Sequence, residues 1–220
     1  MRTIAHLYDN YDTATQVTRD LEAAGFNHED VSIVANQGPT GDGMVTDRSD
    51  TAQAAGATGT GATGAGATGA GAGASIGTIL GGGAGLLAGI GAMAIPGVGP
   101  VVAAGWLVAT LTGAGLGAGA GGLLGSLTGA GVEESHAHVY TEGVRRGGTL
   151  VTVRADDARA TQAETIMLGF HPVDVAAREA SYRANDGWER FDEQGGSLTE
   201  EELAAERRRA MSIPGTTTLL

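Results

Sequence analysis

The sequence contains no cysteine and no lysine, so all 13 of its basic residues are arginines. Without cysteine the chain can form no disulfide, thiol nucleophile or thiolate metal site. Without lysine it has no P-loop lysine, Schiff-base lysine or Ser-Lys dyad. Aromatic residues make up only 4% of the chain, and the formal net charge is -12. Because phosphate backbones repel a negative protein, we expect no nucleic-acid partner.

Charged residues are also missing from residues 51–132, which hold most of the chain's 39 glycines. The N-terminus carries acids where a secretory signal needs an apolar run, so we expect it to be cytoplasmic. Composition divides the chain into five parts. They are a mixed segment (1–36), a flexible polar and then Ala/Thr/Gly-rich linker (37–74), an apolar glycine-rich segment (75–132), a second mixed segment (133–180) and a flexible charged tail (181–220).

The first mixed segment has the pattern of a β-α-β unit. Residues 3–8 and 31–35 are rich in β-branched and apolar residues and predict two strands. Between them, residues 11–26 predict a helix with Val17 and Leu21 on its buried face. Asp12 is the predicted N-cap, and Gly25 is expected to end the helix in the left-handed conformation.

The second mixed segment repeats this pattern. Residues 149–155 predict a strand, residues 156–168 a helix capped by Asp156 or Asp157, and residues 173–178 a short strand. Two such units predict a ferredoxin-like α+β sandwich, in which a four-stranded antiparallel sheet carries both helices on one face. The residues between the second and third strands form an insertion, which must return to the side it left. An insertion that entered a membrane would therefore cross it an even number of times.

The glycines of the apolar segment recur every four residues, in two rows. Residues at this spacing share one helix face, and small residues there let two helices approach closely. Between the rows, "IPGVGP" predicts a reversal, because proline cannot continue a helix and glycine permits tight turns. We therefore predict a helical hairpin over about 75–95 and 101–131. Its helix-packing residues are Gly73, Gly77, Gly81, Gly85, Gly89, Gly113, Gly117, Gly121, Gly125 and Gly129, and its turn residues are Pro96, Gly97, Gly99 and Pro100.

Three environments are open for this segment. Glycine costs roughly 1 kcal/mol per helical position in water, so such helices need close packing or a bilayer. A membrane hairpin is favoured by the long uncharged stretch and by a first helix long enough to cross a bilayer. A soluble hairpin, buried within the protein or between subunits, is favoured by the absence of flanking arginine clusters. A disordered linker is disfavoured by the four-residue spacing.

Residues 3–35, the "AIPGVGPVVAAG" turn and "EGVRRGGTLVTVRADD" together resemble bacterial proteins with the general stress protein 17M-like (YflT-like) domain. The resemblance covers roughly residues 1–36 and 75–177. It implies a stress-associated bacterial protein of unknown biochemical activity, and it supplies no catalytic residues. Shorter members of that family lack the glycine hairpin, so their behaviour does not transfer to it.

The sequence offers no catalytic, cofactor-binding or metal-binding residues. His136 and His138 are two positions apart, which points them to opposite sides of a helix and rules out a shared metal. That helix is expected to bury Ala137, Tyr140 and Val144 and to expose an acidic face. Arg145 and Arg146 end it, where cations favour the helix dipole.

The charged tail predicts a short helix near 198–210, with Ser197 and Glu200 as a capping box. Trp188 and Phe191 precede it, as a docking motif for a protein partner or for the domain itself. We expect a non-enzymatic, stress-associated homo-oligomer without cofactor. Its α/β domain is cytoplasmic and attached to the inner membrane through residues 75–132. The alternatives are a fully cytoplasmic protein that self-assembles through its hairpins, and a small-ligand or partner-binding α/β module.

Overall fold

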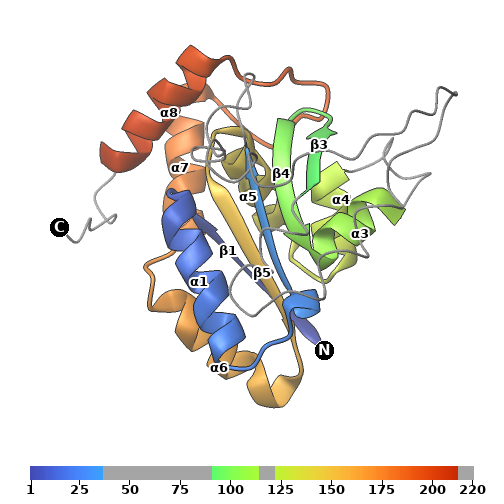
Figure 1. Ribbon diagram of the computed structural model, residues 1–220. Helices are drawn as coiled ribbons and strands as arrows, with labels where there is room; N and C mark the ends of the chain where they lie inside the picture. The colour runs from blue at the N-terminus through green and yellow to red at the C-terminus, as the bar shows by residue number, and fades with distance from the viewer. Residues whose placement is uncertain (37–90, 114–121, 213–220) are drawn as a thin grey trace, which may run out of the picture.

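The computed structural model describes residues 1–36, 91–113 and 122–212, which form an α+β fold around a five-stranded antiparallel sheet (Figure 1). The strand order is β1-β5-β2-β4-β3. The strands are β1 (Arg2–Tyr8), β2 (Val31–Asn36), β3 (Gly91–Ile95), β4 (Gly99–Gly105) and β5 (Thr149–Ala155). The helices are α1 (Tyr11–Ala23), the 3-10 turn η1 (His28–Asp30), α3 (Trp106–Gly113), α4 (Gly122–Gly129), α5 (Glu134–Arg145), α6 (Asp157–Leu168), α7 (Val175–Asp186) and α8 (Glu200–Ser212).

The first β-α-β unit has the order that the sequence predicts. β1 and β2 both pair antiparallel with β5, so they run parallel with β5 between them. The predicted cap of α1 is wrong by two residues, because Asn10 Oδ1 accepts the Asp12 N–H at 2.7 Å. Gly25 has a φ of 87°, the left-handed conformation predicted for it.

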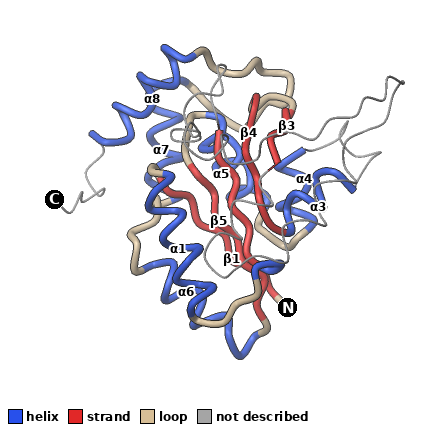
Figure 2. Tube along the Cα trace, viewed as in Figure 1, coloured by secondary structure: helices blue, strands red, loops and turns tan. Residues whose placement is uncertain are grey.

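Helices cover both faces of the sheet (Figures 1 and 2). α1 and α6 pack on one face, and their core includes Val17, Leu21, Val151, Val153 and Met167. α3, α4 and α5 pack on the opposite face, around Val101, Leu107, Leu123, Leu127 and Leu150. Because both faces are covered, every residue of β2 is buried rather than every second one.

The predicted helical hairpin is wrong at residues 91–105. The reversal at "IPGVGP" is present, but it joins strands β3 and β4. β4 pairs along β2, with Ala35 opposite Val102. Backbone groups of β2 would otherwise lack partners in a buried strand, and this pairing outweighs the small-residue helical pattern. Residues 106–113 and 122–129 are helical as predicted, while 75–90 and 114–121 lie outside the described residues.

The predicted strand at 173–178 is also wrong. Val173 donates its N–H to the Leu7 carbonyl oxygen of β1 at 2.8 Å, as a fourth strand would begin. Asp174 Oδ1 then accepts the Ala177 N–H at 2.9 Å and caps α7. This cap starts a helix where the sandwich would place its last strand.

Residues 181–212, expected to be part of a flexible tail, are folded against the domain. Gly187 ends α7 with a φ of 62°, and residues 188–199 cross the end of the sheet to α8. The short helix near 198–210 is confirmed as α8, but its capping box is Thr199 with Glu202, not Ser197 with Glu200. Glu202 Oε2 accepts the Thr199 N–H at 2.8 Å.

Candidate functional site

Only some of the predicted helix-packing glycines fall within the described residues. Gly113 ends α3, and Gly125 and Gly129 belong to α4. α3 and α4 lie against each other, but a Cβ built on Gly129 meets no described atom within 4 Å. The other members, Gly73, Gly77, Gly81, Gly85, Gly89, Gly117 and Gly121, lie outside the described residues, so their packing stays a prediction.

The predicted turn residues do form a tight turn, between β3 and β4. Gly97 and Gly99 have φ angles of 74° and 99°, which favour glycine. Val98 donates its N–H to the Ile95 carbonyl oxygen at 3.1 Å, and its side chain is fully buried. Pro96 and Pro100 flank the turn.

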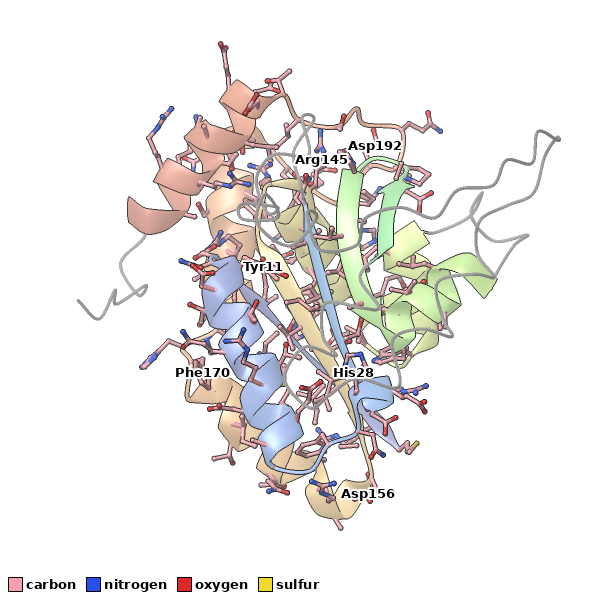
Figure 3. The ribbon with its side chains drawn as sticks, viewed as in Figure 1. Tyr11, His28, Arg145, Asp156, Phe170 and Asp192 are labelled. Atoms are coloured by element: carbon pink, nitrogen blue, oxygen red, sulfur yellow. The ribbon has the colours of Figure 1, made fainter. Side chains whose placement is uncertain are left out.

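Residues 188–199, which we call the C-terminal strap, pass directly over this turn. A Cβ on Gly97 would lie 2.9 Å from the Asp192 carbonyl oxygen, and one on Gly99 would lie 2.8 Å from the Ser197 Cβ. Figure 3 shows Asp192 and Arg145 at this same end of the sheet. Phe191 enters the core beside the turn and is only 5% exposed. The two glycines therefore allow the turn both its bend and its contact with the strap.

A cluster of charged residues, which we call the arginine cluster, joins α5 to the C-terminal residues. Arg145 donates from Nη2 and Nε to the Gly196 carbonyl oxygen in the strap, at 3.0 and 3.2 Å. Arg146 donates from Nε to Glu142 at 2.7 Å, and from Nη1 to Asp186 and Glu206. α5 thus holds the strap through one arginine and the α7 and α8 helices through the next.

Glu142 is the acidic centre of this cluster and is fully buried. Arg145 and Arg146 both donate to its carboxylate, three and four residues along α5. Burial opposes the charge of Arg146, but Asp186 and Glu142 outweigh it and hold its pKa above the ordinary value. A buried carboxylate bonded in this way holds two arginines in fixed directions.

Three further contacts complete the cluster. The Arg146 guanidinium carbon lies 4.2 Å from the centroid of the Tyr182 ring, and Trp188 packs edge-on against that ring. Burial raises the pKa of Tyr182 to about 12, against the opposing effect of nearby Arg178 and Arg146. Arg178 in turn donates to both carboxylate oxygens of Asp9 at 2.8 Å.

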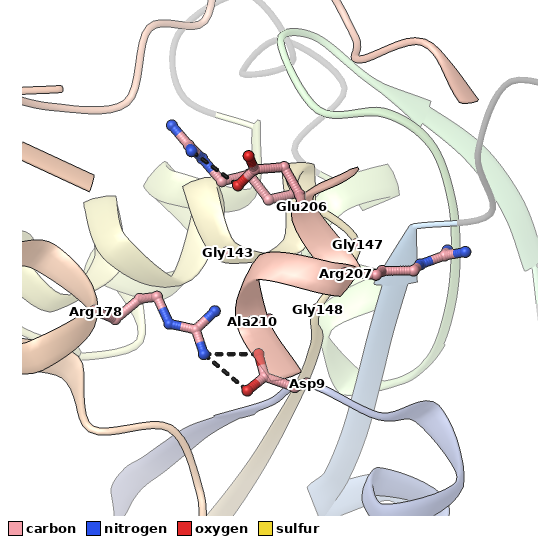
Figure 4. A pocket seen from close by; sticks show the side chains of 9 residues that line it. Asp9, Gly143, Gly147, Gly148, Arg178, Glu206, Arg207 and Ala210 are labelled. Atoms are coloured by element: carbon pink, nitrogen blue, oxygen red, sulfur yellow. Dashed lines mark hydrogen bonds and ion pairs between the residues drawn. The ribbon is translucent and has the colours of Figure 1, made fainter. Parts of the chain in front are cut away.

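A cavity of about 20 Å³ lies under α8 in this region (Figure 4). Its walls include Asp9, Arg178, Gly148, Glu206 and Ala210. That volume accommodates a water molecule but not a substrate. The charged groups around it bond mainly to one another, as the Arg178–Asp9 pair in Figure 4 illustrates.

Other candidate chemistry is weak. His138 Nε2 lies 3.9 Å from Glu134 Oε1, and the described residues contain no group of three His, Asp or Glu side chains arranged for a metal. Within residues 1–36, 91–113 and 122–212, no helix combines the length and apolar character that a bilayer crossing requires.

Sequence reasoning missed the burial of Glu142 and the folding of the strap. The expected acidic face of α5 is not fully solvated, although Ala137, Tyr140 and Val144 are buried as predicted. The sequence did contain a signal for the ion pairing of Glu142, since two arginines follow it at the i+3 and i+4 positions. No comparable local signal ties the strap to the "IPGVGP" turn, about a hundred residues away.

The chain matches no family model, no curated protein and no solved structure. No residue role therefore comes to this chain from a relative, and its function is argued from the geometry described above.

Proposed function

We propose that this chain is a non-enzymatic structural protein that self-associates through residues 51–90, the uncharged part of the insertion between β2 and β3 (residues 37–90). The observation that carries this proposal is where the insertion begins and ends. β2 ends at Asn36 and β3 begins at Gly91, with β4 between them. Two strand spacings separate the ends by about 10 Å, and two residues of register add about 7 Å along the strands. The insertion thus starts and returns about 12 Å apart on a rigid sheet.

The described part of the apolar glycine-rich segment (75–132) belongs to the folded domain. Leu107, Leu123 and Leu127 lie in the core of the α+β domain, so they contribute to folding rather than to an external contact. The glycine row from Gly73 to Gly89 is not part of the described core, and we assign it to contact between copies. The acidic domain repels other copies, whereas residues 51–90 carry no charge to repel them.

A non-enzymatic role is supported by the arginine cluster. Its buried charged groups bond to each other, and the cavity among them is the size of a water. We therefore propose that the folded domain serves as a scaffold that carries the insertion. The stress-associated role that the family resemblance implies, and a ferredoxin-like character of the β1-α1-β2-β5-α6 arrangement, are part of the same proposal.

Attachment to a membrane is the second candidate, favoured by the uncharged length of residues 51–90. Two crossings need about 20 mainly apolar residues each. Residues 51–74 contain no Val, Ile, Leu, Met or Phe, and the large aliphatic residues of the insertion's uncharged part all fall in 75–90. One short apolar segment fits contact between copies, or shallow insertion, better than it fits two crossings.

The test compares mass and membrane binding of the full chain. Light scattering after size exclusion should give a multimer whose mass depends on concentration, and vesicles should not carry the protein in a flotation gradient. Gly81→Leu with Gly85→Leu should return the chain to a monomer, because leucine holds the helix faces apart. Gly83→Leu, in the same segment but outside the row, is the matched control and should leave the mass unchanged. A monomeric wild type would refute self-association, and co-flotation with vesicles would favour the membrane candidate.

A further inference from the structure

The C-terminal strap contacts the hairpin β3–β4 through one deep anchor. Phe191 is 5% exposed and packs in the same core as Ile95 and Val98 at the turn. Neighbouring strap residues Asp192, Glu193 and Ser197 are in contact with the turn through backbone or short side-chain atoms. A single aromatic anchor supplies most of the apolar area in such a contact.

The turn is shaped to receive the strap. A side chain at Gly97 would collide with the backbone of Asp192 and Glu193, and one at Gly99 with Ser197. Both glycines also need positive φ angles, so the close approach and the bend occur at the same two positions. The strap and the turn are therefore complementary surfaces of one chain.

The contact between the strap and the β3–β4 turn also involves Asn36, the residue after which the insertion begins. Asn36 is the last residue of β2, and its Nδ2 donates to the carbonyl oxygens of Val98 and Arg145, each at 3.1 Å. Arg145 donates its own side-chain N–H groups to Gly196 in the strap. The start of the insertion, the β3–β4 turn and the strap thus meet within one hydrogen-bonded group.

We propose that the C-terminal strap is a latch that holds the β3–β4 hairpin in the sheet. When the strap is released, the hairpin loses its cover and separates from β2. Residues 91–105 then become available to join the uncharged residues before them in contacts between copies. This last consequence rests on the proposed self-association, whereas the latch itself does not.

The composition of the interface suits a reversible contact. Beyond Phe191, the strap contacts the domain through the bonds from Arg145 to the Gly196 carbonyl oxygen and through close approach to Gly97 and Gly99. Contacts that are mainly polar separate at lower cost than a continuous apolar core. The hairpin, by contrast, has an uncharged sequence that suits both the sheet and an apolar contact.

The test is hydrogen exchange of the full chain, followed peptide by peptide, in Phe191→Ala. Loss of a buried phenylalanine should raise exchange across 94–105 on the order of a hundredfold. Exchange in α1 and α6, on the other face of the sheet, should stay unchanged. Trp188→Ala is the matched control, because Trp188 lies next to the strap anchor but packs on Tyr182 of α7. It should leave 94–105 protected.

Arg145→Gln is the milder second variant, since it removes the bonds to Gly196 and to Glu142 and leaves Phe191 in place. It should raise exchange in the same peptides by a smaller factor. Unchanged exchange at 94–105 in both variants, or an equal rise throughout the domain, would overturn the latch. The molecular mass of Phe191→Ala in solution separately tests the claim that the released hairpin joins contacts between copies. A selective rise in exchange without larger multimers keeps the latch and counts against self-association through this segment.

Discussion

Leu107→Ala distinguishes a core role of the uncharged segment from a membrane or linker role. Leu107 is the second residue of α3, is fully buried, and packs in the core with Leu123 and Leu127. Removing three carbons from such a site costs about 2–5 kcal/mol of unfolding free energy, because a cavity remains. In urea this loss should lower the unfolding midpoint by on the order of 1 M.

The assay is urea unfolding of the full chain, followed by circular dichroism. Leu86→Ala is the matched control, since it makes the same change within the same uncharged stretch but in the segment proposed for assembly. It should leave the unfolding midpoint within a few tenths of a molar. Equal midpoints for wild type and Leu107→Ala would refute the assignment of α3 to the domain core.

Three further predictions concern single positions in the fold. Gly105 has a φ of 90°, and a Cβ there would collide with the Val31 carbonyl oxygen, so Gly105→Ala should abolish the β2–β4 pairing and lower soluble yield. Glu142→Gln should destabilise the domain by about 1–3 kcal/mol in thermal unfolding, because two partly buried arginines lose their shared carboxylate. Burial lowers the pKa of His6 from its ordinary 6.5, although Glu164 opposes this, so the unfolded chain takes up the proton first. Stability should therefore fall as the pH drops below 6.5, and His6→Gln should remove part of that fall in urea midpoints measured at pH 7 and pH 5.

Local patterns were sufficient for the elements that depend on local chemistry. Residues 149–155 form a strand with the predicted bounds, and Asp156 caps α6 by accepting the Arg159 N–H at 2.9 Å. Gly25 follows α1 in the left-handed conformation, as predicted. For α1, α6 and β5 the apolar spacing alone indicates the element that forms, so tertiary contacts had nothing to override there.

Elements that depend on distant partners could not be predicted in this way. Residues 91–105 consist of small and β-branched residues, which suit either a tightly packed helix or a buried strand, and only β2 decides between them. Val173 starts a strand contact with β1, but Asp174 stops it by capping α7. The arginine cluster depends on Asp186 and Glu206, which lie 40 and 60 residues from Arg146 in sequence.

The central claim is that the long uncharged stretch is divided: residues 91–113 and 122–132 are folded into the domain, and residues 51–90 are proposed to act between copies. Hydrogen exchange of the full chain in aqueous buffer, without lipid, tests this claim most directly. Peptides covering 94–111 and 122–129 should be protected to the same degree as β2 and β5. Exchange at those peptides as fast as in an unfolded chain, with protection gained only when vesicles are added, would contradict it.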